Sequence, residues 1–206
     1  MNLLSYNSTG LSTLKTSWIC DLSKVINASF IGIQEHFRKS KTIDKFFNNE
    51  FPDHNSYVIP GYREPGQDSG RPKAGIAQLS TKSLKIKKTR IATKSYRIQA
   101  QVLELPNSKL LWLNAYFPTD PATHNFDDQE LMEVLSEIQS IMDNTVFDDI
   151  ICGGDLNWHK GRETGFASTV DGFIDRLGLV SVWDHFEVDF THIRTYLKSV
   201  INLDNF

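Results

Sequence analysis

The sequence predicts an α/β fold in which two β-sheets pack face to face and helices flank the pair. Two observations support this prediction. Apolar runs of strand length alternate with segments whose apolar residues recur at helical spacing, and four strand candidates follow one another in the middle of the chain. Such elements bury their apolar faces when each sheet packs on the other sheet and on helices.

The first predicted unit is a strand, a helix and a second strand. The stretch LLSYNSTGL carries Asn7 out of an apolar run into a polar turn, as at a strand end. Residues 11–27 predict an amphipathic helix that begins near Ser12 and crosses over between strands. The run from Phe30 to Ile33 predicts the second strand, with Glu35 at its end. The apolar face of the helix would be Leu11, Leu14, Trp18, Leu22, Val25 and Ile26.

A short helix, a loop and a run of strands come next. Phe46, Phe47 and Phe51 predict the helix. The segment from Pro60 to Pro72 is rich in Gly, Pro and Asp and resembles an active-site loop. Four strands are then predicted, and the turn PNSK between the last two predicts a hairpin. Their sequences are GIAQLS, LKIKKT, RIQAQVLEL and LLWLNAY.

Helices and strands alternate again in the last third of the chain. Asp127 or Asp128 is expected to cap a helix that runs to about Met142 and has one apolar face. DIICGG predicts a strand, and Val170 to Leu177 predicts a helix that ends at Gly178. The segments FTH and SVINLDNF predict short strands near the end of the sequence.

The length and composition of the chain are typical of one globular domain. The chain has 206 residues, of which 40% are hydrophobic, so we expect a single domain over residues 1–206 with a substantial core. No apolar run approaches the roughly 18 residues of a membrane span, and the N-terminus lacks the pattern of a signal peptide. We therefore expect no membrane partner and an intracellular protein, in the nucleus or the cytoplasm. Two cysteines are too few for a disulfide framework or a zinc site.

Charge is distributed unevenly, although the net charge is only −3. Between Arg63 and Arg97 there are ten Lys or Arg against two carboxylates, and residues 120–189 are acidic. The basic block suits phosphate contacts along a nucleic-acid backbone. Lysines on edge strands also deter aggregation, so a solvated strand face explains the block equally well.

The most informative segment is DDIICGGDLNWH, in which a strand delivers Asp155 and Asn157 to a glycine-rich turn. Residues two apart in an extended segment project to the same face, so both can reach one metal ion, water or phosphate. Gly153 and Gly154 would allow close backbone approach. By itself the pair is also ordinary turn chemistry. Three earlier strand ends present further polar residues, namely Asn7, Glu35, and Asn114 with Tyr116 and Asp120.

Five segments in order resemble the endonuclease/exonuclease/phosphatase family, which includes abasic-site endonucleases and deoxyribonuclease I. These segments are SYNSTG, QEH, SGRPKAGIAQL, LNAYFPTD and GGDLN. The chain resembles above all the endonuclease domain of non-LTR (LINE-type) retrotransposons, in which similar segments lie at similar distances. The resemblance extends from Leu3 to Phe206 and implies the DNase I-like sandwich of two sheets flanked by helices.

The resemblance also implies a metal site. Phosphodiester cleavage needs a metal ion to offset charge, an oriented water, and stabilisation of the oxygens around phosphorus. Glu35, with Asn7 beside it, would hold Mg²⁺ or Mn²⁺. Carboxylate and carbonyl oxygens suit these ions, and no Cys/His cluster in the sequence competes.

The catalytic roles follow from the same resemblance. Asp155 would position or deprotonate the attacking water, and Asn157 would orient that water and bind a phosphate oxygen. Tyr116 would donate to the phosphate or to the leaving oxygen. Asn114 would support the hydrogen bonds of the site from behind.

The sequence departs from the family at its end. The family ends in a serine-aspartate-histidine motif, whereas this sequence stops at INLDNF. Asp204 resembles the aspartate that orients the family's catalytic histidine, and that histidine has no counterpart here. We therefore expect an incomplete domain that lacks its last strand or strands, and little or no activity from residues 1–206 alone.

Three functions are compatible with these observations. The first is an Mg²⁺-dependent phosphodiesterase that nicks DNA, as the endonuclease domain of a retrotransposon polyprotein with a reverse transcriptase domain as its partner. In this reading Arg71 and Lys73 contact DNA. The second is a catalytically impaired fragment that keeps the fold and nucleic-acid binding. The third is a phosphoesterase that acts on a lipid or a small phosphate ester.

Overall fold

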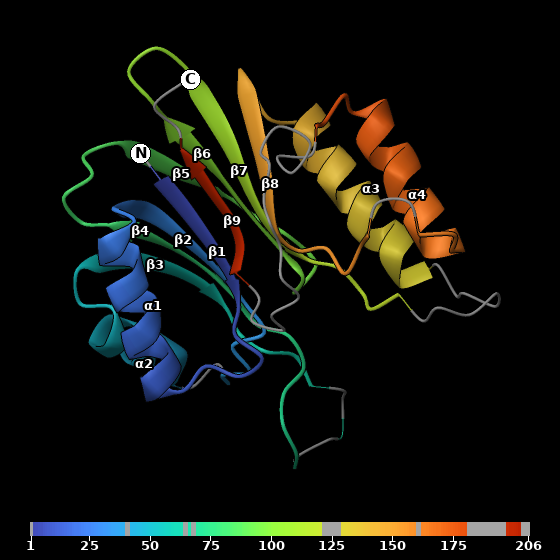
Figure 1. Ribbon diagram of the computed structural model, residues 1–206. Helices are drawn as coiled ribbons and strands as arrows, with labels where there is room; N and C mark the ends of the chain where they lie inside the picture. The colour runs from blue at the N-terminus through green and yellow to red at the C-terminus, as the bar shows by residue number, and fades with distance from the viewer. Residues whose placement is uncertain are drawn as a thin grey trace.

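Two β-sheets pack face to face in the computed structural model. Helices α1 (Thr13–Val25) and α2 (Ile43–Glu50) cover one outer face, and α3 (Gln129–Asp143) and α4 (Gly165–Arg176) cover the other (Figure 1). The predicted α/β sandwich of two sheets flanked by helices is confirmed. No helix among the described residues combines the length and apolar character of a membrane span. The structure describes residues 2–39, 42–63, 66, 69–120, 129–159, 162–180 and 197–202.

The first sheet consists of β1 (Asn2–Asn7), β2 (Ala28–Gln34), β3 (His54–Ile59), β4 (Ile76–Thr81) and β9 (Leu197–Asn202). Their order is β3-β4-β2-β1-β9. β1 and β2 run parallel because α1 crosses over between them, and the other neighbours are antiparallel. Ser12 caps α1 as predicted, since its hydroxyl accepts a hydrogen bond from the backbone N–H of Lys15.

The second sheet consists of β5 (Lys87–Ile91), β6 (Ile98–Glu104), β7 (Lys109–Tyr116) and β8 (Asp149–Asp155). These strands lie in sequence order, with β7 and β8 parallel and the other pairs antiparallel. The predicted hairpin between β6 and β7 is confirmed, and its turn is closed by a hydrogen bond from Leu105 N to Ser108 O at 2.9 Å.

The two parallel pairs bring four strand ends together. At the end of β1, Asn7 lies opposite Gln34, the residue before Glu35. At the end of β7, Tyr116 lies opposite Asp155. A hydrogen bond between Asn7 and Asp155 places both ends at one edge of the sandwich. Sheet topology therefore assembles the polar strand ends that the sequence singled out.

Three apolar clusters hold the layers together. One lies between the first sheet and α1 and α2, and a second lies between the second sheet and α3 and α4. The predicted apolar face of α3, from Leu131 to Ile141, is wholly buried in the second cluster. The third cluster lies between the sheets, where the rings of Phe30 and Trp112 meet edge to face at 5.3 Å.

Buried amides also join the inner faces of the two sheets. Gln34 Nε2 donates to Asn114 Oδ1 at 2.6 Å, and Asn114 Nδ2 donates to the carbonyl of Ala77 at 3.0 Å. Gln101 Nε2 donates to Gln78 Oε1 at 2.8 Å. A buried amide is costly unless it is hydrogen-bonded, so this amide seam favours a single arrangement of the sheets.

Helix α1 buries only part of the face that was predicted. Leu11, Leu22 and Ile26 pack in the core of the first sheet as expected. Leu14 and Val25 are 81% and 82% exposed, whereas Thr16, Ile19 and Ser23 face the sheet. The hydroxyls of Thr16 and Ser23 donate to carbonyls of the helix itself, so both side chains can be buried without losing hydrogen bonds. Apolar spacing alone therefore gave only part of the buried face of this helix.

One strand was not predicted, and two elements begin at other residues than predicted. β3 was not predicted, because it is a partly buried edge strand with a weak apolar pattern. β5 begins at Lys87, later than the predicted segment LKIKKT. α4 begins at Gly165 rather than Val170, because the Thr164 side chain caps it. The predicted strand FTH and the predicted caps Asp127 and Asp128 lie outside the described residues.

Candidate active site

Two short hydrogen bonds connect strand ends from opposite sheets. Asn7 Nδ2 donates to Asp155 Oδ2 at 2.5 Å, across a sequence separation of 148 residues. The Tyr116 hydroxyl donates to Glu35 Oε1 at 2.5 Å, across 81 residues. Because Tyr116 and Asp155 are also register partners in β7 and β8, the four side chains form one cluster.

The backbone at Glu35 is unusual. Its φ is +53°, in the left-handed region that residues with a Cβ rarely adopt. The Glu35 carbonyl accepts hydrogen bonds from the Ser8 hydroxyl at 3.0 Å and from Gly10 N at 2.7 Å. The turn after β1 therefore holds the backbone of Glu35 in a strained conformation, as is frequent at functional sites.

Asp155 is buried, and N–H groups serve both of its carboxylate oxygens. Asn7 Nδ2 donates to Oδ2, and the backbone N of Asn157 donates to Oδ1 at 3.2 Å. Asn157 has a φ of +47°, and its side-chain Nδ2 donates to the carbonyl of Phe117 at 2.8 Å. These bonds fix the orientation of the Asp155 carboxylate beside the Asn157 turn.

Of the two glycines before Asp155, Gly154 is the one that the structure requires. Its φ is +140°, and a Cβ there would lie 1.9 Å from the carbonyl oxygen of Ala115. A Cβ at Gly153 would meet open space. Close backbone approach therefore occurs at Gly154, where it lets β8 place Asp155 next to Tyr116.

The environment of Tyr116 keeps its hydroxyl protonated. Burial raises the pKa of Tyr116, and the hydrogen bond to Glu35 raises it further. Arg97 acts in the opposite direction, with its guanidinium carbon 4.9 Å from the ring centroid. Arg97 is itself paired with Glu130 of α3 at 2.7 Å. At neutral pH the phenol is thus a hydrogen-bond donor and not a base.

Asn114 lies behind this cluster, in the amide seam between the sheets. It is 1% exposed and bonds to Gln34 of β2 and to Ala77 of β4. It therefore holds β7, which carries Tyr116, against β2, which leads to Glu35.

No protein-family model and no curated protein matches the chain, but solved structures do. The endonuclease domain of TRAS1, a telomere-specific non-LTR retrotransposon, aligns with a TM-score of 0.64 and 14% identity over 97% of this chain and 82% of that domain. The AP endonuclease LMAP from Leishmania major aligns with a TM-score of 0.63 and 13% identity over 85% of this chain. The chain has the DNase I-like fold.

A third DNase I-like structure, D. rerio TDP2 complexed with a single-strand DNA product, aligns with a TM-score of 0.55 and 15% identity over 89% of this chain and 69% of that protein. The chain spans 66% of the length of the Leishmania enzyme. At these identities the likeness shows the endonuclease/exonuclease/phosphatase fold, as the sequence resemblance implied.

The oxygen-rich cluster of this DNase I-like chain fits a hard divalent cation. Within the described residues, no three His, Cys, Asp or Glu side chains gather as a metal site. The cluster instead offers the carboxylates of Glu35 and Asp155 and the amide of Asn7. Mg²⁺ is usually held by one or two carboxylates together with waters and substrate phosphate oxygens, so this donor set fits Mg²⁺ or Mn²⁺.

The basic block is divided between the two ends of the DNase I-like sandwich. Arg71 and Lys73 are exposed and lie just before β4, at the end that carries the candidate site. The Arg71 guanidinium lies 3.9 Å from the ring centroid of Phe37. Lys87 lies at the far end, where it pairs with Glu104 at 2.7 Å. Phosphate contact therefore suits the first two cations, and a solvated strand face suits Lys87.

Asp204, the predicted orienting aspartate, lies outside the described residues. Asp120 accepts a hydrogen bond from Thr164 and forms an ion pair with Arg162. It therefore connects the segment after β7 to the start of α4. The sequence assigned Arg97 only to the basic block. Its place at the start of the predicted strand RIQAQV is the feature that could have put it next to Tyr116, because the backbone N–H of Tyr116 donates to the Arg97 carbonyl at 2.8 Å.

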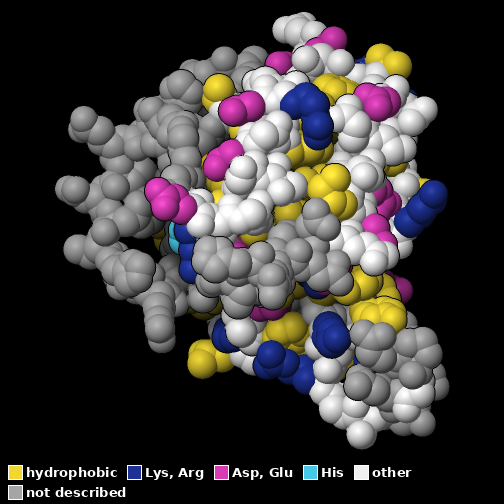
Figure 2. Space-filling view, turned by 90° about the vertical axis from the view of Figure 1, so that its right-hand side faces the viewer, with side chains coloured by type: hydrophobic (Ala, Val, Ile, Leu, Met, Phe, Trp, Pro, Cys, Tyr) yellow, Lys and Arg dark blue, Asp and Glu magenta, His cyan; other side chains and the backbone are white. Residues whose placement is uncertain are grey.

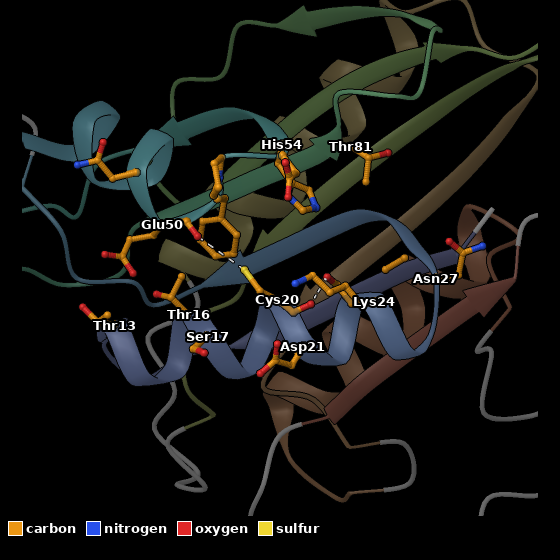
Figure 3. A pocket seen from close by; sticks show the side chains of 16 residues that line it. Thr13, Thr16, Ser17, Cys20, Asp21, Lys24, Asn27, Glu50, His54 and Thr81 are labelled. Atoms are coloured by element: carbon orange, nitrogen blue, oxygen red, sulfur yellow. Dashed lines mark hydrogen bonds between the residues drawn. The ribbon is translucent and has the colours of Figure 1, made fainter.

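A separate groove lies away from the clustered strand ends. It has a volume of about 530 Å³ and runs along α1, between that helix and the start of β3 (Figure 3). Cys20 and Lys24 line it from α1, and His54 lines it from β3. None of the clustered strand-end residues lines this groove, so it is distinct from the candidate active site.

Proposed function

We propose that this chain is a divalent-metal-dependent phosphodiesterase that nicks DNA, of the type found in retrotransposon polyproteins. The observation that carries the proposal is the convergence of Asn7, Glu35, Tyr116 and Asp155 from four strand ends on a DNase I-like fold. The similarity to the TRAS1 endonuclease domain supports the retrotransposon type. The nick would precede copying by a reverse transcriptase domain of the same polyprotein, in the nucleus or the cytoplasm.

In this proposal Asp155 handles the attacking water. Its carboxylate is held from both sides by N–H groups of Asn7 and Asn157, so it presents a fixed acceptor. The water's oxygen attacks phosphorus and its proton passes to Asp155, while the bond from phosphorus to the leaving oxygen breaks and that oxygen keeps the electron pair. Asn157 orients the water and binds a phosphate oxygen. A fixed base of this kind lowers the cost of orienting the nucleophile.

Tyr116 acts on the phosphate directly, and Glu35 acts through the metal ion. The protonated Tyr116 hydroxyl, which now donates to Glu35, would donate to a phosphate oxygen or to the leaving oxygen. Glu35 and Asn7 would hold Mg²⁺ or Mn²⁺. When bound, the ion would offset the negative charge that develops around phosphorus.

Surface charge supports DNA as the substrate. Arg71 and Lys73 are exposed at the end of the sandwich that carries the site. On the face formed by α3 and α4, carboxylates are spread over much of the surface, and Lys and Arg side chains gather at its lower edge (Figure 2). A DNA backbone would be attracted to that edge and repelled from the acidic part of the face.

Plasmid nicking with Mg²⁺ tests the proposal. The assay compares residues 1–206, the same chain extended past Phe206, and the Asp155→Ala variant of each. We expect the extended chain to nick the plasmid in a reaction that requires Mg²⁺ and is lost in its Asp155→Ala variant, and we expect little or no nicking by residues 1–206. Equal residual rates in variant and parent would indicate a contaminating nuclease. DNA binding without nicking would favour a catalytically impaired fragment, and cleavage of a lipid or small phosphate ester alone would favour the third reading.

A further inference from the structure

A stack of two tyrosines connects the two sheets outside the catalytic cluster. The rings of Tyr62 and Tyr96 lie 4.8 Å apart with an interplanar angle of 6°. Tyr62 follows β3 of the first sheet, and Tyr96 precedes β6 of the second sheet. Both residues lie at the end of the sandwich that carries the candidate site, because β3 ends there and β6 begins there. Aromatic pairs at such distances stabilise the segments that they join.

On the side of the first sheet, a backbone bridge connects the stack to Lys73. The backbone N–H groups of Tyr62 and Lys73 each donate to the other's carbonyl at 2.8 Å, which forms an antiparallel bridge. Side chains that are directly opposite in such a bridge project to the same face. The Lys73 side chain therefore lies on the same face of the bridge as the Tyr62 ring.

The same bridge is anchored at two further points to the segment that follows β2. Gly61 N donates to the carbonyl of Arg38 at 2.9 Å, and the Arg71 guanidinium lies over the ring of Phe37. A Cβ at Gly61 would lie 2.9 Å from the Cβ of Pro72, so the two strands of the loop base are closely packed. The loop cations therefore rest on a base with little freedom to move.

On the side of the second sheet, the stack reaches the catalytic cluster. The Tyr96 hydroxyl donates to Glu130 Oε1 at 3.0 Å, and Arg97 Nε donates to the same oxygen at 2.8 Å. The Arg97 guanidinium then lies over the ring of Tyr116. A continuous series of contacts thus connects the loop base to the residue that would bind the phosphate.

We propose that the stack of Tyr62 on Tyr96 is a positioning device for DNA: it holds Arg71 and Lys73 beside Tyr116, where they contact phosphates next to the one that is cleaved. The proposal rests on the function proposed above. Cations on a preorganised loop lose less conformational freedom on binding than cations on a loose one. Removal of the stack should therefore weaken DNA binding even though no cation is removed.

Equilibrium binding to a double-stranded DNA oligonucleotide in EDTA, at several salt concentrations, tests the proposal without requiring activity. Tyr62→Ala should raise Kd about three- to tenfold, the range expected for the loss of one aromatic pair. It should also reduce the slope of log Kd against log salt by about one to two, since fewer phosphates are contacted. Tyr62→Phe keeps the ring and should restore both values. Lys87→Ala removes a cation at the far end and should bind like the parent chain.

The outcomes separate this proposal from the proposed function. If the parent chain binds DNA with steep salt dependence and folded Tyr62→Ala binds with the same Kd and slope, the positioning role is overturned and the nuclease proposal stands. If the parent chain does not bind DNA, both fail. Should Tyr62→Ala not fold, Tyr62→Leu removes the ring but keeps an apolar contact on Tyr96, and parent-like binding by that variant overturns the positioning role.

Discussion

Acidification from about pH 7 to about pH 4 should destabilise the protein through one buried histidine. The His36 ring is 1% exposed, and its two nitrogens contact the carbonyl of Ile59 and the backbone N–H of Arg38, each at 3.0 Å. Only the neutral ring, with the proton on Nε2, satisfies both contacts, because Nδ1 must accept. Burial lowers the pKa of His36 from 6.5 to about 4.

The sign and size of the effect follow from linkage. Since the folded pKa lies below the unfolded value, the unfolded chain binds more protons between these two pH values. The contribution to stability is therefore fully present above about pH 6.5 and is lost as the pH falls to about 4. The loss through this residue alone is about 3 kcal/mol.

Urea unfolding at a series of pH values, in parent chain and His36→Gln, measures this loss in metal-free buffer. Carboxylates titrate in both proteins, so their contribution cancels in the difference. The parent should lose about 3 kcal/mol more than the variant between pH 7 and pH 4. If the two proteins lose the same free energy of unfolding, or if NMR shows that His36 titrates near pH 6.5, His36 is not the cause of the acid destabilisation.

Three further predictions concern the strand ends. Gly154→Ala should lower the free energy of unfolding by more than about 3 kcal/mol, because the added Cβ overlaps the Ala115 carbonyl. Gly153→Ala should change that free energy by no more than about 1 kcal/mol, and urea unfolding of both variants measures the difference. Asn114→Ala should cost about 2–3 kcal/mol in thermal unfolding, because it leaves buried amide partners unsatisfied. Tyr116→Phe should reduce the Mg²⁺-dependent nicking rate about a hundredfold while leaving the melting temperature nearly unchanged, and an unchanged rate would exclude Tyr116 from phosphate binding.

The sequence predicted the layers and the strand ends of this fold because both depend on local patterns. Apolar runs that end in Asn7, Glu35, Tyr116 and Asp155 are visible in the sequence, and parallel pairing brings the ends together two by two within each sheet. The buried face of α1 was only partly predicted, since two hydroxyl side chains could be buried by bonding to the helix's own carbonyls.

The finer geometry of the site depends on contacts that no local pattern encodes. The left-handed backbone of Glu35 is held by the turn after β1, and the partner of Asn7 lies 148 residues away. The stack of Tyr62 on Tyr96 joins two loops from different sheets. Sequence spacing could assign these residues to strand ends and loops, but not to one another.

The most direct test of the account is the Mg²⁺-dependent nicking rate of Asp155→Ala relative to its parent, measured for residues 1–206 and for a chain that continues past Phe206. Asp175→Ala, which removes an exposed carboxylate from α4, is the matched control. In the longer chain we expect a fall of about a thousandfold or more for Asp155→Ala and a parental rate for Asp175→Ala. Full parental nicking by a folded Asp155→Ala protein that is free of contaminating nuclease would show that the four strand ends do not form the active site.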